Sequence, residues 1–433
     1  MSLISRISLN QNTQHSSNVW RATCVVMMGR ELCIVSVSYW DNIRIHFLSL
    51  FFGGWVFFKR FVKWIWDPNG FFKLQLRDKP PDCLVDSTLG QHKYVKLKGV
   101  KFHYVESGSK ENPLIILLHG FPDCWLSWRY QIPALSENFH LIALDLKGFG
   151  DSDKPLSKRS YRIEVILEEL KQLIASLGVS STTIIGHDLG ALLGWYFVHQ
   201  YPEMVDKFFA VSCPHPNIYW KSLSTTLNYQ WVNFAQLPYL PEIDALKEDV
   251  RIITDYHNYL PAKDVYLEAY KYSFSRKEDW TGPINYYRNL PFTKISDNCE
   301  QINVTTVLVT GNKDNFLKLE DIVKSTEFCE KFYMKIIDGA GHFPHQESPE
   351  MFNKILLKYL RKHSITKNVD RSPSKYLMDR MFGAVSNIST YGNSVLDSVQ
   401  KRTNGVVNNL HNFNLGSSSN SNNEDVTDSF KFS

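Results

Sequence analysis

Cysteine is scarce in this chain of 433 residues, which holds seven cysteines between positions 24 and 329. The number is odd, and no two of them form a C-x-x-C pair, so the sequence indicates neither a disulfide framework nor a zinc site. N-x-[ST] patterns at Asn303 and Asn387 point the other way, but so short a pattern often arises by chance. We therefore expect a protein of a reducing compartment.

Excess charge is also missing. The net charge is +4 for a mass of 50.2 kDa, and no block of lysines and arginines stands out in the middle of the sequence. A protein that follows a phosphate backbone needs clustered cations. Nucleic acid is therefore excluded as the expected partner, and the composition fits an ordinary globular protein.

A long apolar run is present near the N-terminus. Residues 1–42 show no usable periodicity and receive no fold assignment, whereas residues 45–58 are mostly apolar or aromatic. A bilayer-spanning helix needs ~20 apolar residues, a length reached here only if the cations that follow extend toward lipid head groups. We expect residues 43–66 to anchor the chain in a membrane, by spanning it or by lying in its interface. A buried core helix is the alternative.

Cations flank this run unequally. Arg30 and Arg44 precede it, and the cations that follow are Lys59, Arg60, Lys63, Lys73 and Arg77. The positive-inside rule then places the following domain on the cytoplasmic side, and we expect the endoplasmic reticulum membrane.

From Pro80 onward, apolar runs alternate with helical patterns. Residues 92–108 read as two antiparallel strands joined at Gly99, and short buried strands are expected at residues 114–118, 140–146, 182–186, 208–212, 305–310 and 332–337. Helices are expected at residues 161–177, 189–200 and 347–362. This alternation predicts an α/β fold with a mostly parallel sheet and helices on both faces.

The pattern divides the chain further. Residues 80–213 and 301–362 form the expected core, and residues 214–300, rich in tyrosine and tryptophan, form a helical cap inserted late in the sheet. Residues 363–433 turn to serine, asparagine and charge, which predicts a disordered tail with one amphipathic helix near residues 376–384.

One pentapeptide, Gly186-His187-Asp188-Leu189-Gly190, lies between an expected strand and an expected helix. Small residues at both ends let the chain turn sharply and point the middle side chain outward, as in a nucleophile elbow. The middle residue here is a carboxylate, which can form an alkyl ester with strained or activated carbon. The alternative is an ordinary aspartate cap of the helix.

Two partners follow in the order nucleophile, acid, histidine. Asp314 comes after the strand at residues 305–310, and His342 comes after Gly339-Ala340-Gly341 beyond the last strand. Hydrolases of this layout place the acid and the histidine at such strand ends. The joint occurrence favours catalysis over a turn aspartate and a surface histidine.

Several motifs between about Pro80 and Lys362 resemble the α/β-hydrolase family, and within it the epoxide hydrolases, especially the animal membrane-anchored branch. They are His119-Gly120-Phe121-Pro122, Ser127-Trp128-Arg129-Tyr130, the segment from Asp145 to Ser152, the elbow, Cys213-Pro214-His215-Pro216-Asn217, and the segment from Gly282 to Asn289. The resemblance implies that Asp188 attacks an epoxide carbon and that His342, oriented by Asp314, activates the water that cleaves the ester. No metal or organic cofactor is implied.

The resemblance also implies four supporting groups. Two cap tyrosines donate to the epoxide oxygen: Tyr287 matches one, and Tyr229 is the better match for the other, with Tyr219 and Tyr239 nearby. The backbone N–H groups of Phe121 and Leu189 hold the oxyanion. Together with the expected anchor, this predicts an enzyme that converts apolar, lipid-derived epoxides to diols.

Leu189 departs from the family pattern, in which most relatives have tryptophan directly after the nucleophile. The missing indole argues against a haloalkane dehalogenase, which uses that tryptophan to hold the halide. A catalytically silent lipid- or partner-binding scaffold is the rival from another class. His119 and His187 are expected to be structural, and His345 is expected at the surface.

Overall fold

The computed structural model describes residues 33–71, 73–75, 77–223 and 229–361, and it leaves the side chains of residues 222, 223, 229 and 230 undescribed. The expected tail helix near residues 376–384, and the tail itself, lie outside this part.

An eight-stranded sheet forms the centre, in the order β10-β9-β7-β6-β4-β5-β3-β2. The bounds are β2 Gln91–Leu97, β3 Val100–Ser107, β4 Leu114–Leu118, β5 His140–Leu144, β6 Thr182–His187, β7 Val205–Val211, β9 Thr305–Gly311 and β10 Phe332–Ile337. Only β2 and β3 run antiparallel to their neighbours, and all other pairs are parallel. The predicted mostly parallel sheet is confirmed.

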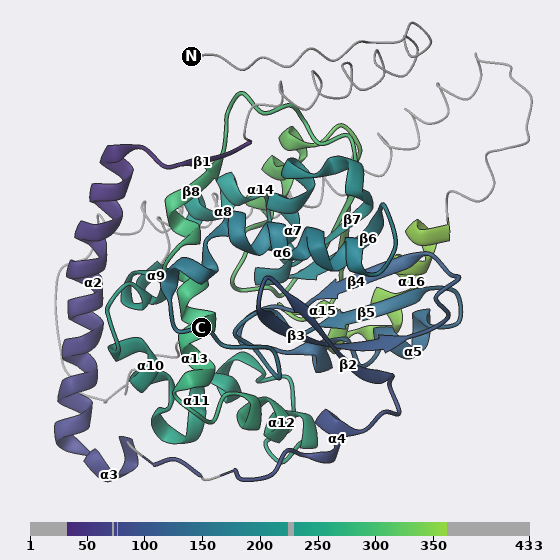
Figure 1. The fold of residues 1–433 in the computed structure, drawn as a ribbon. Coiled ribbons are helices and arrows are strands. Elements are labelled where there is room, and N and C mark those ends of the chain that lie inside the picture. The colour runs from purple at the N-terminus through teal and green to yellow at the C-terminus, as the bar shows by residue number, and fades with distance from the viewer. Residues whose placement is uncertain (1–32, 72, 76, 224–228, 362–433) are drawn as a thin grey trace, which may run out of the picture. The chain divides into compact units, whose positions relative to one another are not determined.

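The central strands form because their residues are apolar on both faces. Every residue of β4, β5 and β6 is buried, as expected of strands covered on both sides. At the edge, β2 and β3 join through Lys98 and Gly99, both with positive φ, which gives a tight hairpin turn. Helices flank the sheet (Figure 1), namely α5 Gln131–Leu135, α6 Ile163–Ser176, α7 Leu189–Gln200, α14 Leu319–Lys324, α15 Pro344–Glu347 and α16 Pro349–Leu360.

Between β7 and β9 the chain forms the helices that we call the cap: α8 Pro216–Leu223, α9 Tyr229–Ala235, α10 Leu240–Ala245, α11 Lys247–Tyr256, α12 Val265–Ser273 and α13 Glu278–Tyr287. Helix α13 is held against the loop after β5. The hydroxyl of Tyr286 donates to the Lys147 carbonyl at 3.1 Å. A Cβ on Gly282 would lie 2.6 Å from the Gly148 Cα, so the two backbones meet only because both residues are glycine. This contact fixes the helix that carries Tyr287.

The N-terminal segment contributes β1 Ile34–Ser36 and α2 Tyr39–Trp66, followed by α3 Pro68–Phe71 and α4 Asp82–Val85. The Ser38 side chain caps α2 by accepting the Asp41 N–H at 3.1 Å, so the helix starts four residues before the expected anchor at residues 43–66. By length and composition α2 could cross a membrane. Strand β1 pairs antiparallel with β8, Thr293–Ile295, a short strand inside the segment expected to be helical.

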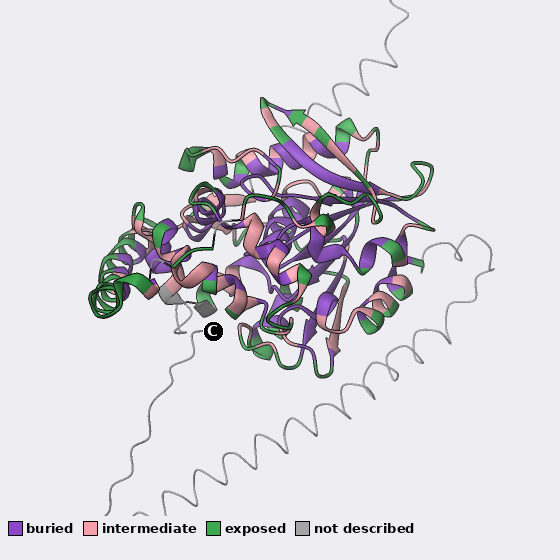
Figure 2. Cartoon of the chain, turned by 90° about the horizontal axis from the view of Figure 1, so that it is seen from below, coloured by how far each residue is buried: buried purple, intermediate pink, exposed green. Residues whose placement is uncertain are grey.

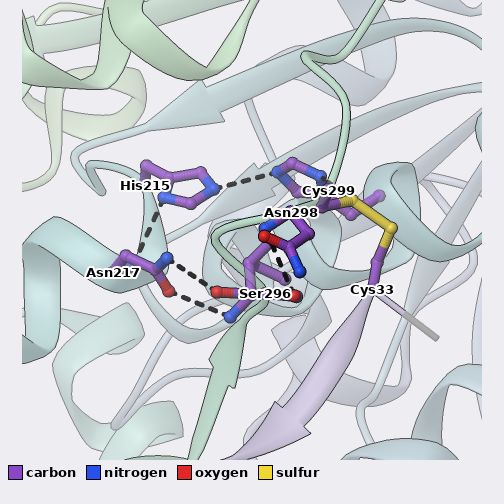
Figure 3. Close-up of a disulfide and its surroundings, with 8 residues drawn as sticks. Cys33, His215, Asn217, Ser296, Asn298 and Cys299 are labelled. Atoms are coloured by element: carbon purple, nitrogen blue, oxygen red, sulfur yellow. Dashed lines mark hydrogen bonds between the residues drawn. A yellow bond between two sulfur atoms is a disulfide. The ribbon is translucent and has the colours of Figure 1, made fainter. Parts of the chain in front are cut away.

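The described residues hold one disulfide, although the number and spacing of the cysteines indicated no disulfide framework. Cys33, just before β1, is bonded to Cys299, just after β8, and their Cα atoms are 5.4 Å apart (Figure 3). The two cysteines are 266 positions apart, and spacing rules detect only framework patterns or local pairs. Pairing of β1 with β8 brings them together, and the sequence did not predict either strand.

We predict that Gly282→Ala destabilises the protein by about 1–3 kcal/mol, because the added methyl group must displace α13 from the Gly148 backbone. Gly54→Ala is the matched control, because a Cβ there meets nothing within 4 Å; it should leave stability unchanged or raise it by up to about 1 kcal/mol. Chemical denaturation of both variants measures the difference. Equal free energies of unfolding for the two variants would contradict the role of this contact.

Candidate active site

Asp188 sits at the turn between β6 and α7 with φ 45° and ψ −112°, a conformation that is costly for a residue other than glycine. The turn is tight because its glycines allow it: a Cβ on Gly186 would lie 2.5 Å from the Gly190 carbonyl oxygen, and one on Gly190 would lie 2.2 Å from the Leu118 carbonyl oxygen. The Asp188 side chain makes no capping hydrogen bond to α7. The helix-cap alternative is therefore wrong.

The Asp188 carboxylate is instead turned toward the loop after β4. Its Oδ2 accepts the Phe121 N–H at 3.1 Å, and the nearby backbone N–H of Leu189 helps to lower the pKa of the carboxyl group. The side chain of Leu189 is buried. Both backbone groups singled out in the sequence thus meet at the predicted nucleophile.

His342 and Asp314 come from the loops after β10 and β9. The two loops pack closely at Gly311, where a Cβ would lie only 2.0 Å from the Ala340 carbonyl oxygen. The Lys313 N–H donates to the same oxygen at 2.9 Å. His342 Nδ1 donates to Asp314 Oδ2 at 2.9 Å, and its Nε2 lies 3.8 Å from Asp188 Oδ1. The three residues predicted as nucleophile, acid and base lie together.

Two carboxylates control the charge of His342. Burial disfavours the imidazolium, but Asp314 and Asp188 outweigh this effect and raise the pKa of His342 to about 10. Burial likewise disfavours the Asp188 carboxylate, but hydrogen bonding to His342 and the charge of His342 lower the pKa of Asp188. The resting site therefore holds an imidazolium between two carboxylates.

Aromatic side chains from the cap cover the site. Tyr287 is buried on α13, and its ring centroid lies 5.2 Å from that of Phe121. Burial, and then the negative charge of Asp188, raise the pKa of the Tyr287 phenol well above 10. The ring of Trp231 stacks on that of Phe121, with centroids 5.9 Å apart. The phenol of Tyr287 therefore stays protonated among buried aromatic side chains.

Two further tyrosines lie near Asp188. Burial, and then Asp188, raise the phenol pKa of Tyr219 and of Tyr256. Sequence reasoning named Tyr219 only as a neighbour of Tyr229 and missed Tyr256, whose surroundings match no motif. Tyr229 is the first residue of α9, and its side chain is not described, so its role stays a prediction. Tyr239 is 71% exposed, which removes it from the alternatives.

Three further histidines around the site form hydrogen bonds within the protein, and one of them lies elsewhere than the sequence predicted. His119 accepts the Leu146 N–H, and His187 Nε2 donates to the His342 carbonyl oxygen at 2.9 Å. His345 was expected at the surface but is fully buried, with its Nε2 2.8 Å from Ser127 Oγ. The expectation failed because the short helix α15 packs against the 3-10 helix Trp125–Trp128, which carries Ser127. The same burial raises the pKa of Asp123, which accepts a hydrogen bond from Ser127, to about 7.

Two groups of side chains in the described residues have metal-ligand chemistry. One is Cys33, His199 and Cys299, whose thiols are joined in the disulfide. The other is Asp123, His187 and His345, which lies in the hydrogen-bonded network just described. Neither contains a residue of the Asp188 site.

Known proteins are similar to this chain over most of its hydrolase domain. Residues 113–349 match the model of the alpha/beta hydrolase fold family. The chain is 33% identical over 328 residues to human epoxide hydrolase 4, covering 71% of this chain and 90% of that protein. It is 36% identical over 310 residues to epoxide hydrolase 3 of Xenopus tropicalis, covering 68% and 84%.

Solved structures are similar over the same region. An epoxide hydrolase of Bacillus megaterium in complex with an inhibitor has a TM-score of 0.53 and 31% identity, covering 62% of this chain and 99% of that one. An epoxide hydrolase of Vigna radiata has a TM-score of 0.56 and 27% identity, covering 63% and 98%.

The raised pKa of His342 makes stability depend on pH. An imidazolium favoured in the folded state stabilises the protein fully below the unfolded pKa of about 6.5, and this contribution is lost as pH rises toward about 10. We predict that the difference in unfolding free energy between the wild type and His342→Gln is constant below about pH 6 and shrinks above it. Denaturant titrations at a series of pH values measure it, and a difference that grows with pH would contradict the assignment.

Proposed function

Since the chain belongs to the α/β-hydrolase family and is an epoxide hydrolase, we propose that it converts apolar, lipid-derived epoxides to diols through an ester on Asp188. One observation carries this proposal: the Asp188 carboxylate faces the Phe121 N–H on one side and His342 on the other. The proposed nucleophile, oxyanion donor and base thus lie next to one another in the protein interior.

In the first step the Asp188 carboxylate attacks an epoxide carbon and forms the ester bond while the C–O bond of the ring breaks. As negative charge develops on the leaving oxygen, it takes up the phenol proton of a cap tyrosine, which becomes a phenolate. Tyr287 supplies the hydrogen bond, together with Tyr229 from α9. A buried phenol with a raised pKa keeps its proton until the alkoxide forms, so it is a suitable donor.

The second step follows from the charge change of the first. Ester formation removes the negative charge of Asp188, so one of the two carboxylates that raise the pKa of His342 is lost. The pKa falls, so the imidazolium releases its proton, which restores the phenol of the cap tyrosine through solvent, and the neutral imidazole becomes available as a general base. His342 then deprotonates a water that attacks the Asp188 carbonyl carbon, and Asp314 stabilises the imidazolium.

Hydrolysis completes the cycle. The backbone N–H groups of Phe121 and Leu189, which hold the carboxylate at rest, hold the oxyanion of the tetrahedral intermediate. Collapse of this intermediate breaks the ester C–O bond, and the proton of the new carboxyl group passes to the departing oxygen, which releases the diol and leaves Asp188 as a carboxylate beside the imidazolium of His342. The scheme requires only the substrate epoxide and water, without metal or organic cofactor.

The preference for lipid-derived epoxides rests on the surroundings of the pocket. The aromatic rings of Phe121, Trp231 and Tyr287 favour an apolar substrate. Helix α9, which carries Trp231, packs directly on the apolar helix α2, where the Ser49 hydroxyl donates to Asn233 Oδ1 at 3.3 Å. A substrate dissolved in a membrane beside α2 would be concentrated one helix away from the site.

We predict that Asp188→Asn abolishes diol formation and that His342→Gln allows the first step but not the second. After exposure to an epoxide, the His342→Gln protein should carry the added mass of the substrate on the peptide that contains Asp188, as measured by mass spectrometry. An unmodified peptide would contradict the ester mechanism. Tight lipid binding without diol formation by the wild type would favour the binding-scaffold alternative.

We predict that Tyr287→Phe lowers kcat roughly 10- to 1000-fold, as expected for loss of one oxyanion donor. Tyr229→Phe should have a similar effect, and Tyr239→Phe is the control, because Tyr239 is exposed. Turnover of styrene oxide and of epoxy fatty acids by the full chain in detergent measures all three variants. If Tyr229→Phe has no effect while Tyr219→Phe slows turnover, Tyr219 is the second donor.

A further inference from the structure

The N-terminal end of α2 is fixed to the hydrolase domain. Strand β1 pairs with β8 from Ile34 to Ser36, and the Ser296 N–H donates to the Cys33 carbonyl oxygen at 2.7 Å. The Asn217 side chain holds β8 in place through two hydrogen bonds of 2.9 Å to the backbone of Ile295. The disulfide closes this corner covalently (Figure 3).

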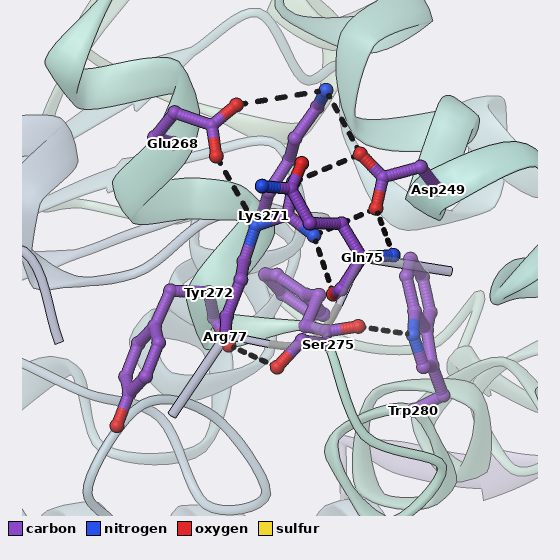
Figure 4. Close-up of polar contacts among 9 residues, drawn as sticks. Gln75, Arg77, Asp249, Glu268, Lys271, Tyr272, Ser275 and Trp280 are labelled. Atoms are coloured by element: carbon purple, nitrogen blue, oxygen red, sulfur yellow. Dashed lines mark hydrogen bonds and ion pairs between the residues drawn. The ribbon is translucent and has the colours of Figure 1, made fainter. Parts of the chain in front are cut away.

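The C-terminal end of α2 is fixed to the same domain. Arg60 forms an ion pair with Asp244 at 3.2 Å, and Lys63 pairs with Glu248. Past the helix, Arg77 binds Asp249 through two hydrogen bonds of 2.7 and 2.9 Å (Figure 4).

The cap segment that receives these contacts is strained. Glu248, Asp249 and Val250 have φ angles of 51°, 57° and 56°, a left-handed conformation that is unfavourable for such residues. The Asp249 N–H donates to the Lys73 carbonyl oxygen, and its carboxylate accepts the Gln75 N–H. The segment that follows α2 therefore supports a cap conformation that is costly by itself.

These two attachments decide how α2 can meet a bilayer. The helix has 28 residues and is about 42 Å long, enough to cross a hydrocarbon core of about 30 Å. A crossing helix would separate Cys33 from Arg77 by the whole membrane, yet both are bound to one folded domain. The helix cannot cross while both attachments exist.

The two faces of α2 differ accordingly. The face toward the cap is lined by Ile45, Ser49, Gly53 and Val56, and a Cβ on Gly53 would lie 3.1 Å from Leu237. The outer face carries exposed apolar side chains, among them Trp40, Phe47, Phe51, Trp55, Phe58 and Ile65. In Figure 2, which looks along α2 at the left of the picture, the exposed colour lies on the side away from the cap.

Two of the three cations that interrupt the apolar run, Arg60 and Lys63, are directed toward the cap, whereas Lys59 is exposed and lies over the ring of Trp55. Arg60 and Lys63 pair with cap carboxylates, and so does Arg77. Three of the five cations counted for the positive-inside rule are therefore neutralised within the protein, which weakens the expectation of a cytoplasmic domain. The disulfide argues for an oxidising compartment, because such bonds are rare in the cytosol.

We propose that α2 lies in the plane of one leaflet, with its outer face among the lipids and the hydrolase domain beside it on the oxidising side of the membrane. A lipid monolayer fits the outer face better than a protein partner, because aromatic and aliphatic side chains run along most of the helix and tryptophans lie at both ends. The proposal does not depend on the chemistry assigned to Asp188.

A glycosylation site reports on the side of the membrane. Asn303 begins the sequence Asn303-Val304-Thr305, an acceptor pattern, and lies exposed in the loop before β9. A second acceptor can be created before α2 by Gln14→Ser, which gives Asn12-Thr13 followed by serine. An in-plane helix on the oxidising side places both sites where glycosylation occurs.

The first experiment expresses the full chain in cells with a secretory pathway and measures glycosidase-sensitive mass. All proteins carry Asn387→Gln, which removes the other acceptor pattern of the sequence. In this background the chain should carry a glycan that Asn303→Gln removes, and Gln14→Ser should add one. Glycosylation of only one of the two sites means that α2 crosses the bilayer, and glycosylation of neither places the domain in the cytoplasm. Either result overturns the proposal. Peptide mapping without reduction should recover Cys33 linked to Cys299.

The second experiment tests the lipid face with vesicles of phosphatidylcholine. The triple variant Phe47→Gln, Phe51→Gln and Phe58→Gln should bind at least about 10-fold more weakly in flotation, because three large apolar side chains no longer leave water. The control is Leu156→Gln, an equally exposed position of the hydrolase domain. Turnover of a soluble epoxide in detergent should stay unchanged in both. If the triple variant instead converts a dimer to a monomer and vesicle binding is unaffected, the face binds a second copy and the proposal is wrong.

Discussion

The active site depends on how closely the backbone of the elbow approaches its neighbours. Gly190 lies against the Leu118 carbonyl oxygen at the end of β4, and this contact sets Asp188 opposite the Phe121 N–H of the following loop. Any side chain at position 190 would push α7 away from β4 and separate the carboxylate from that donor. A similar contact between Gly311 and Ala340 joins the loops that hold Asp314 and His342. Close packing of the backbone thus fixes the positions of the residues that form the site.

Charge balance links the two halves of the proposed reaction. At rest, His342 is an imidazolium between two carboxylates. The Asp188 carboxylate helps to raise the pKa of His342, and the imidazolium in turn lowers the pKa of Asp188. The arrangement keeps Asp188 ionised in a buried pocket, where a lone carboxylate would tend to be protonated. Consumption of the Asp188 charge in the ester then releases His342 from one of its partners. One electrostatic cluster therefore suits both a nucleophile and, afterwards, a base.

The cap joins this site to the N-terminal helix. Tyr287 is placed by the contact of Gly282 with Gly148. Trp231 stacks on Phe121 and belongs to α9, the helix that packs on α2. The same cap receives the ion pairs of Arg60, Lys63 and Arg77. An apolar helix fixed in this way forms part of the enzyme's surface, and it brings the substrate pocket close to any membrane on which the outer face lies.

The sequence by itself determined the parallel sheet, because runs such as Ile115 to Leu118 are apolar on both faces, and it located Asp188, Asp314 and His342, because these follow strands whose ends must meet at one edge. The sequence did not predict the positions of residues that depend on packing between distant segments. The tertiary structure alone revealed the bond between Cys33 and Cys299, the burial of His345 and the presence of Tyr219 and Tyr256 beside Asp188. The orientation of α2 belongs to the same group. Local periodicity records which face of a segment is apolar, but the partner of that face is fixed only when distant segments pack together.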